Sequence, residues 1–251
     1  MSEKILNSLL MSRFFDNIKF KVDLEEVIMS QIVNIVSGGR IGDRYFFRKR
    51  ISVMENCLII CCDGGVRHLQ QTGIKPDVII GDMDSIDPAQ LESYSRRGIK
   101  IIKYQANKDF TDTELALDYA INLKPEAIYI WAALGGRIDH TLSNVFLLGK
   151  GKAFSVKTYL IDKYCEAFLL NGDVTFNKSV GQTVSLIALS PQVEGITLRG
   201  FLYPLDDATL RMGESRAVSN IIKEENATVS VRSGNLLVIH YWQKNIFPEA
   251  L

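Results

Sequence analysis

Residues 58–85 read LIICCDGGVRHLQQTGIKPDVIIGDMDS, and this stretch indicates the fold class. It contains two short apolar runs, 58–62 and 78–80, which are too short for helices and predict buried strands. The segment 66–72 between them predicts a short helix. A strand, a helix and a second strand in succession are typical of a parallel pair of strands joined by a helical crossover.

The same alternation continues on both sides of this stretch. Further strands are predicted at 31–36, 99–104 and 127–133, and further helices at 88–97, from Thr111 onward and at 140–148. Asp87 followed by Pro88 is typical of a helix N-terminus. We therefore expect an α/β domain over residues 29–152, built on a doubly wound, mostly parallel sheet. Ligands of such sheets bind beyond the carboxyl ends of the strands.

After residue 152 the pattern changes to short strand-like runs without helices between them. These runs lie at 156–161, 166–170, 183–189, 193–198, 217–222, 228–231 and 236–241. Clusters of Gly, Asn, Asp and Ser separate several of them, which is typical of an antiparallel sandwich or barrel. We expect a C-terminal antiparallel β-sandwich domain over residues 153–251. Residues 1–28 carry no motif and form an N-terminal extension.

Composition excludes several classes of partner. The 251 residues include 29 Lys and Arg against 29 Asp and Glu, so no net charge attracts nucleic acid or anionic lipid. No apolar stretch reaches the roughly 20 residues of a membrane span, and no signal-peptide core precedes the first domain. Three of the four cysteines lie in or beside the apolar run at 58–62, which suits buried, reduced thiols. We expect a cytoplasmic protein without a nucleic-acid or membrane partner.

The motif GDMDS at 81–85 is the first candidate for chemistry. In an extended segment Asp82 and Asp84 point the same way, and two close carboxylates repel unless a cation lies between them. Carboxylate oxygens are the ligands that Mg²⁺ prefers, together with waters and substrate phosphates. Two aspartates in a solvated turn give the same pattern, so this motif alone leaves both interpretations open.

The motif KDFTD at 108–112 lies between a predicted strand and a predicted helix. In the structural interpretation, Thr111 caps the helix and Asp112 compensates its dipole. In the functional interpretation, Asp112 is a third metal ligand and Lys108 is a counter-charge for phosphate. The motif by itself favours the structural interpretation.

The motif GGRIDH at 135–140 also lies between a strand and a helix, and DGG at 63–65 repeats the strand-then-glycine arrangement. Glycines there let the backbone approach a phosphate at a helix N-terminus, and Arg137 adds a forked cation. Neither a Walker A loop nor a GxGxxG fingerprint is present. Aspartates cluster at the strand ends and require cations, which a metal ion with a polyphosphate supplies: Asp63, Asp82, Asp84, Asp109, Asp112 and Asp139.

In chain order, the four motifs at 63–65, 81–85, 108–112 and 135–140 resemble the thiamine pyrophosphokinase family. The similarity resumes with GFLYPL at 200–205 and VSN at 218–220. The resemblance implies an N-terminal α/β nucleotide domain, a C-terminal β-sandwich, and a homodimer with active sites between subunits.

Carried onto this chain, the resemblance assigns roles to particular residues. It implies a Mg²⁺ site at Asp82, Asp84 and Asp112, with Arg137 and Asp139 completing the catalytic set. It implies ATP and phosphate binding by Asp63, Gly64, Gly65, Lys108, Asp109, Thr111, Gly135, Gly136 and Arg137. Thiamine contacts are implied for Tyr203, Ser219 and Asn220.

The expected reaction is in-line attack of the thiamine hydroxyl on the β-phosphorus of ATP, which releases AMP. Asp112 or Asp139 is the candidate proton acceptor, and the sequence selects neither. Two alternatives are a pyrophosphokinase with another acceptor, such as a pterin alcohol, and a non-catalytic sensor of thiamine or nucleotide. The full set of acidic positions argues against the sensor, because binding alone does not require a metal cluster.

Overall fold

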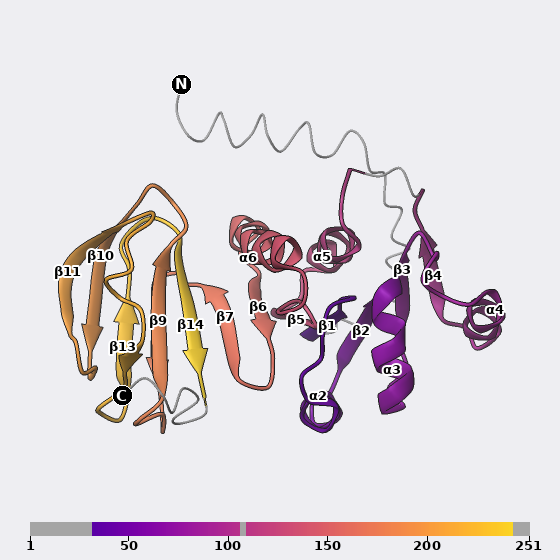
Figure 1. Ribbon diagram of the computed structural model, residues 1–251, viewed down its shortest axis with the longest axis horizontal. Coiled ribbons are helices and arrows are strands. Elements are labelled where there is room, and N and C mark those ends of the chain that lie inside the picture. Colours follow the sequence, from indigo (N-terminus) through magenta and orange to yellow (C-terminus); the bar gives the residue numbers. More distant parts are fainter. Residues whose placement is uncertain (1–31, 106–108, 243–251) are drawn as a thin grey trace.

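The computed structural model describes residues 32–105 and 109–242 (Figure 1). Six neighbouring strands of its main sheet run parallel, in the order β6-β5-β1-β2-β3-β4. Their bounds are β1 Ile32–Val36, β2 Cys57–Cys62, β3 Val78–Gly81, β4 Lys100–Lys103, β5 Ala127–Trp131 and β6 Lys157–Ile161. This arrangement confirms the doubly wound α/β fold predicted from the sequence.

Helices cover both faces of the parallel strands. Their bounds are α2 Arg44–Ser52, α3 Val66–Thr72, α4 Pro88–Arg96, α5 Asp112–Asn122 and α6 Ile138–Ala153. Leu115 of α5 and Leu148 of α6 pack with Ile35 and Ile128 in one apolar core. Helices α2, α3 and α4 pack on the opposite face, where their core includes Phe47, Leu69, Tyr94 and Trp131. Figure 1 shows α5 and α6 on one side of the sheet and α2 on the other.

The main sheet continues into the C-terminal part of the chain. β7 (Cys165–Leu169) pairs antiparallel with β6, and β14 (Leu236–Tyr241), β9 (Thr183–Ala188) and β12 (Asn220–Ile221) follow it outward. A second antiparallel sheet has the order β11-β10-β13-β8. Its strands are β8 Asp173–Phe176, β10 Gln192–Arg199, β11 Leu205–Arg211 and β13 Ala227–Ser230.

The two sheets of the C-terminal part enclose their own core. Phe168, Leu186 and Val238 from the main sheet meet Ile196 and Val229 from the second sheet. Sheet-on-sheet packing of this kind confirms the predicted β-sandwich. One ten-stranded sheet therefore passes through both the α/β part and the sandwich, and the expected boundary at residue 152 falls in the last turn of α6.

Helix α2 and the strands β8 and β11 were not predicted from the sequence. Helix α2 reads RYFFRKRIS and buries only Phe47 and Ile51, so its polar residues hide the helical period. Its N-cap Asp43 accepts a hydrogen bond from the Phe46 amide at 3.0 Å. β8 and β11 are edge strands of the second sheet with few buried residues. Edge strands need little apolar alternation, and the sequence signal for them is weak.

The cysteines are free thiols, as expected. Cys61, Cys62 and Cys165 are buried, and burial raises the pKa of the Cys165 thiol to about 12. None of the helices within 32–105 and 109–242 combines the length and apolar character that a bilayer crossing requires.

Candidate active site

A cavity of about 980 Å³ lies beyond the carboxyl ends of β1, β2 and β5. β1 lies between β2 and β5 in the sheet, so the chain crosses over in opposite directions on the two sides of β1. Such a reversal opens a crevice at the strand ends. The predicted residues that line the cavity are Asp63, Gly64, Thr111, Asp112, Gly135, Gly136 and Arg137.

The loops around the cavity require glycine because backbone packs directly on backbone. A Cβ atom at Gly65 would collide with the carbonyl oxygen of Val36, and one at Gly39 would collide with that of Ala132. The loops that follow β1, β2 and β5 therefore approach one another more closely than side chains permit. Gly65 is buried and does not line the cavity; its place is in this packing.

Three carboxylates form an acidic cluster at the edge of the cavity: Asp63, Asp82 and Asp84, each with an oxygen within 4.8 Å of the others. Met83, between the last two, has a φ of 67° and buries its side chain. Ser85 joins the cluster through its hydroxyl, which donates to Asp84 at 3.0 Å, and its amide, which donates to Asp63 at 3.4 Å. The motifs at 63–65 and 81–85 thus meet at one point.

Asp112 approaches the same point from the N-terminus of α5. An added Cβ atom at Gly81 would lie 2.7 Å from the Cβ atom of Asp63 and 3.3 Å from Oδ2 of Asp112. Both side chains therefore contact the end of β3, and glycine leaves room for them. Asp112 stands beside the three-residue acidic cluster.

The electrostatics of the cluster favour a cation. Burial raises the pKa of the Asp63 carboxyl; hydrogen bonds from Ser85 oppose this rise, and the nearby Asp112 and Asp82 carboxylates add to it. Asp63 is only 3% exposed, so water cannot compensate for the repulsion. A donor set made only of carboxylate oxygens fits a hard divalent ion such as Mg²⁺.

At the start of α5, Thr111 fulfils the predicted capping role: its Oγ1 accepts a hydrogen bond from the Glu114 amide at 3.2 Å. Thr113 and Ser37 share a buried hydrogen bond of 2.7 Å between their hydroxyls, which fixes α5 to the loop after β1. Asp109 is exposed and does not line the cavity. Lys108, predicted as a phosphate counter-charge, lies outside the described residues.

The opposite wall of the cavity is the glycine turn before α6. Gly135 and Gly136 have φ values of 81° and 88°, a conformation that favours glycine. The Gly135 amide donates to Thr141 Oγ1 at 3.2 Å, and the buried Asn144 amide group donates to the Ala133 carbonyl at 2.8 Å. The turn is therefore held in one shape at the N-terminus of the longest described helix.

Arg137 and Asp139 form an exposed ion pair at this helix start. Arg137 Nε donates to Asp139 Oδ1 at 3.1 Å, and Arg137 lines the cavity whereas Asp139 does not. The hydrogen bond from Arg137 lowers the pKa of the Asp139 carboxyl to about 2. A carboxylate with so low a pKa is a weak proton acceptor, which disfavours Asp139 as a general base.

Several cavity residues were not selected from the sequence. Arg40, Arg44 and Arg67 line the cavity, as do His68 and His140. Arg67 donates to the Gly38 and Gly39 carbonyls, the second at 3.0 Å, and His68 Nε2 lies 2.9 Å from the Gly39 oxygen. Arg40 and Arg44 follow Gly38 and Gly39 after β1, which repeats the strand-then-glycine pattern of the recognised motifs. This pattern in the sequence could have identified Arg40 and Arg44 as residues of the cavity.

The three residues predicted to contact thiamine lie together but away from the cavity within this chain. Asn220 is buried, accepts from the Tyr203 amide at 3.1 Å and donates to the Tyr203 carbonyl at 2.7 Å. Ser219 precedes it, with its amide bonded to Ser185 Oγ at 3.0 Å, and the Tyr203 side chain is 65% exposed. Asn220 begins β12 (Asn220–Ile221), which is one edge of the main sheet, and β4 is the opposite edge.

Comparison with known proteins finds similarity over both parts of the chain. Residues 51–160 match the family model described as thiamin pyrophosphokinase, catalytic domain, and residues 173–236 match that of the thiamin pyrophosphokinase vitamin B1 binding domain. Thiamine pyrophosphokinase of Bacillus subtilis (strain 168) is 35% identical over 187 residues, 74% of this chain and 87% of that protein. Thiamine pyrophosphokinase 1 of Oryza sativa subsp. japonica is 28% identical, over 72% and 77% of the two chains.

Comparison with solved structures finds the same family as the comparison of sequences. The crystal structure of thiamine pyrophosphokinase from Bacillus subtilis matches with a TM-score of 0.74 and 31% identity, covering 86% of this chain and all of that one. The thiamin pyrophosphokinase from Geobacillus thermodenitrificans matches with a TM-score of 0.72 and 27% identity, covering 86% and 99%.

Proposed function

The chain belongs to the thiamine pyrophosphokinase family, and we propose how its residues divide the work of that family's reaction. It is an ATP-dependent diphosphotransferase, which transfers the terminal diphosphate of ATP to the hydroxyl of thiamine and gives thiamine diphosphate and AMP. The observation that carries the proposal is a single cavity that is lined by four arginines and has the acidic cluster at its edge, where Asp63 is both a lining residue and a member of the cluster.

We propose that Asp82, Asp84 and Asp112 hold Mg²⁺, with Asp63 as a further carboxylate of the same site. The proposal is supported by the 4.8 Å spacing of three of these groups and by the approach of Asp112 to Gly81. When bound, Mg²⁺ neutralises charge on the phosphate oxygens of ATP.

The polyphosphate is proposed to lie along the glycine turns. Gly64, Gly135 and Gly136 line the cavity, and the positive end of α6 faces the same space. Arg137 supplies a forked cation there, and Arg40, Arg44 and Arg67 line the same cavity. Lys108, Asp109 and Thr111 keep the nucleotide-binding role that the family resemblance implies.

In this arrangement the hydroxyl oxygen of thiamine attacks the β-phosphorus of ATP. The bond between the β-phosphorus and the oxygen that bridges the α- and β-phosphorus atoms breaks, and AMP leaves with the bridging oxygen. The arginines offset the negative charge that develops on the leaving group. Of the two candidate proton acceptors, Asp139 is the weaker base, because its hydrogen bond from Arg137 lowers the pKa of its carboxyl.

We propose that the functional unit is a homodimer in which the cavity of one copy receives the thiamine-binding residues of the other. Residues 29–152 then supply the ATP site, and 153–251 supply the thiamine site through Tyr203, Ser219 and Asn220. Helix α6 carries an apolar stripe with exposures of 76%, 54% and 61% at Ile138, Leu142 and Phe146. These residues are spaced by four and share one face of α6, so a second copy that covers them would also reach the cavity.

The cell compartment is proposed to be the cytoplasm. The support is chemical: the four cysteines are free, and three of them are buried as small apolar side chains. A reducing compartment keeps thiols in this state.

The direct test is product formation from ATP and thiamine with purified protein. We expect thiamine diphosphate and AMP in equal amounts with Mg²⁺, and neither product after chelation with EDTA. A pterin alcohol in place of thiamine serves as the control acceptor and is expected to give no AMP. AMP release with the pterin but not with thiamine, or calorimetric binding of thiamine without AMP formation, would contradict the proposal.

A further inference from the structure

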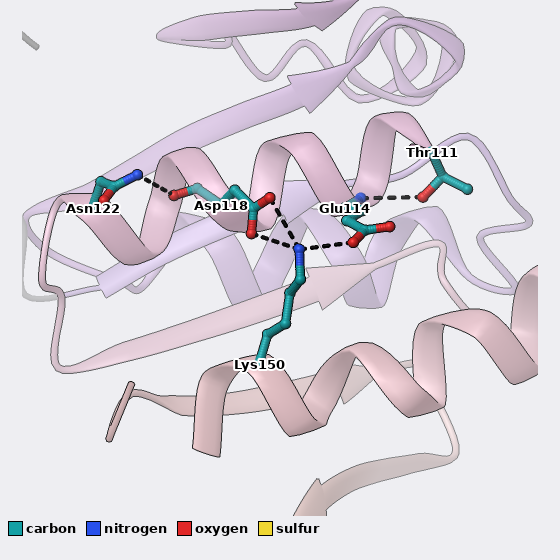
Figure 2. A network of polar contacts seen from close by, with 5 residues as sticks. All are labelled: Thr111, Glu114, Asp118, Asn122 and Lys150. Atoms are coloured by element: carbon teal, nitrogen blue, oxygen red, sulfur yellow. Dashed lines mark hydrogen bonds and ion pairs between the residues drawn. The ribbon is translucent and has the colours of Figure 1, made fainter. Parts of the chain in front are cut away.

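A polar network joins α5 to α6 at a distance from the cavity (Figure 2). Lys150, in the C-terminal half of α6, places its Nζ atom 2.7 Å from Oε1 of Glu114 and 2.8 and 3.0 Å from the two oxygens of Asp118. Asn122 adds a hydrogen bond of 2.9 Å to the Asp118 carbonyl. About a fifth of each charged side chain is exposed, so the ion pairs are partly desolvated and stronger than surface pairs.

The contacts of Lys150 lie on both sides of Asp112 in the sequence. Its ammonium is 5.9 Å from the centre of the Phe110 ring, two residues before Asp112, and it pairs with Glu114, two residues after. The Glu114 amide is in turn bonded to the cap Thr111, as Figure 2 shows. A single side chain on α6 thus contacts residues on both sides of Asp112, Phe110 before it and Glu114 after it.

We propose that Lys150 is a positioning residue for the reaction. By contacting Phe110 and Glu114, on either side of Asp112, it fixes the place of Asp112 beside the acidic cluster. The inference rests on the proposed role of Asp112 in the metal site. Lys150 itself does not line the cavity and acts only through α5.

The charges of Glu114 and Asp118 explain why the contact between the two helices depends on an ammonium group at position 150. Glu114 and Asp118 are four residues apart on α5, and without Lys150 two like charges would repel on one face of the helix. Burial raises the pKa of the Asp118 carboxyl although Lys150 lowers it, and the nearby Glu114 carboxylate adds a smaller rise. Burial lowers the pKa of Lys150, but its hydrogen bonds to both carboxylates outweigh this effect and raise the pKa overall.

The chain offers a matched control two residues along the same helix. Lys152 donates hydrogen bonds from Nζ to the carbonyls of Leu170 and Gly234, at 3.2 and 2.9 Å. It therefore ties α6 to the sandwich and not to α5. Loss of either lysine removes partly buried contacts of α6, but only the loss of Lys150 removes contacts with α5.

The experiment compares Lys150→Met, Lys150→Arg and Lys152→Met with the unmodified chain. Mn²⁺ binding is measured by electron paramagnetic resonance in the presence of α,β-methylene-ATP, which cannot react, and thermal stability and the Mg²⁺ dependence of activity are measured in parallel. We expect Lys150→Met to weaken Mn²⁺ binding about tenfold, as loss of an outer support of a metal ligand does. Lys150→Arg should restore most of it, and Lys152→Met should lower Tm without changing Mn²⁺ binding.

A second variant keeps the test decisive if Lys150→Met does not fold. Glu114→Met removes the contact with the first turn and leaves the Lys150–Asp118 pair in place, and it too should weaken Mn²⁺ binding. Unchanged Mn²⁺ binding in the variants that fold, or an equal loss in Lys152→Met, would overturn the inference. Failure of the unmodified chain to bind Mn²⁺ would instead overturn the proposed metal site, so the two failures are distinguishable.

Discussion

Asp63 and Asp84 belong to one acidic cluster but stand in different surroundings. Asp63 is buried at the end of β2, whereas Asp84 is exposed and is bonded by the Ser85 hydroxyl. A substitution at Asp84 therefore changes the charge of the site with little effect on the core, and one at Asp63 changes both. Asp84 is the better residue with which to separate metal binding from folding.

For Asp84→Asn we expect activity to fall by on the order of a hundredfold or more, because one proposed metal ligand loses its charge. The Tm should stay the same or rise, since removal of one carboxylate relieves repulsion in the cluster. Steady-state turnover and differential scanning calorimetry measure the two effects. Asp206→Asn, on the exposed strand β11, is the control and should change neither. Turnover near that of the unmodified chain would refute the assignment of Asp84 as a ligand.

At the scale of elements, the loops after β1, β2 and β5 are shaped by glycines whose roles differ. Gly135 and Gly136 are needed for positive φ angles, whereas Gly65 is needed because it packs against the Val36 carbonyl. All occur in strand-then-glycine motifs, and the sequence alone does not distinguish the two roles. These loops therefore need one kind of glycine to form the turn and another to let the loops meet.

Gly65→Ala tests the packing role. The added Cβ atom collides with backbone, which cannot move without shifting β1, so we expect a loss of about 3 kcal/mol or more in the free energy of unfolding. Gly73→Ala is the control: its φ of 70° is strained for alanine, but no atom lies within 4 Å, and the cost should be about 1 kcal/mol. Urea unfolding followed by circular dichroism measures both. Equal losses in the two variants would show that Gly65 is not packed as described.

At the scale of the whole molecule, one continuous sheet extends from the cavity to the strand that begins at the thiamine-binding candidate Asn220. β12, which begins at Asn220, is one edge of the ten-stranded sheet, and the cavity lies over β1, β2 and β5. A sheet of this width does not fold back on itself to bring the two together. Completion of the site by a second copy is the arrangement that the proposal requires.

Complementation between two inactive variants tests this arrangement. Asp84→Asn damages the cavity, and the double variant Tyr203→Ala, Ser219→Ala damages the thiamine-binding part. If sites form between copies, an equal mixture that is unfolded and refolded together should recover about a quarter of the unmodified activity, because half of the dimers are mixed and each has one intact site. The same mixture without refolding is the control. Absence of recovery in well-folded dimers would place each site within one chain.

The amino-acid sequence by itself determined the fold class and most elements of this protein. Apolar runs such as 58–62 and 78–80 appeared as the buried strands β2 and β3, and Thr111 appeared as the cap of α5, because burial and capping are local properties of a few residues. Helix α2 was not found from the sequence, since only Phe47 and Ile51 mark its buried face. The identity of the acidic residues was also readable, because their motifs follow strands.

Only the tertiary structure decided how these residues meet. It placed Asp63 with Asp82 and Asp84, although the sequence suggested a phosphate contact for it, and it added Arg40, Arg44 and Arg67 to the cavity wall. It also joined Lys150 to Glu114 across two helices. Distances between segments far apart in the chain depend on sheet order and on how closely backbones pack, and neither is a property of any local stretch of residues.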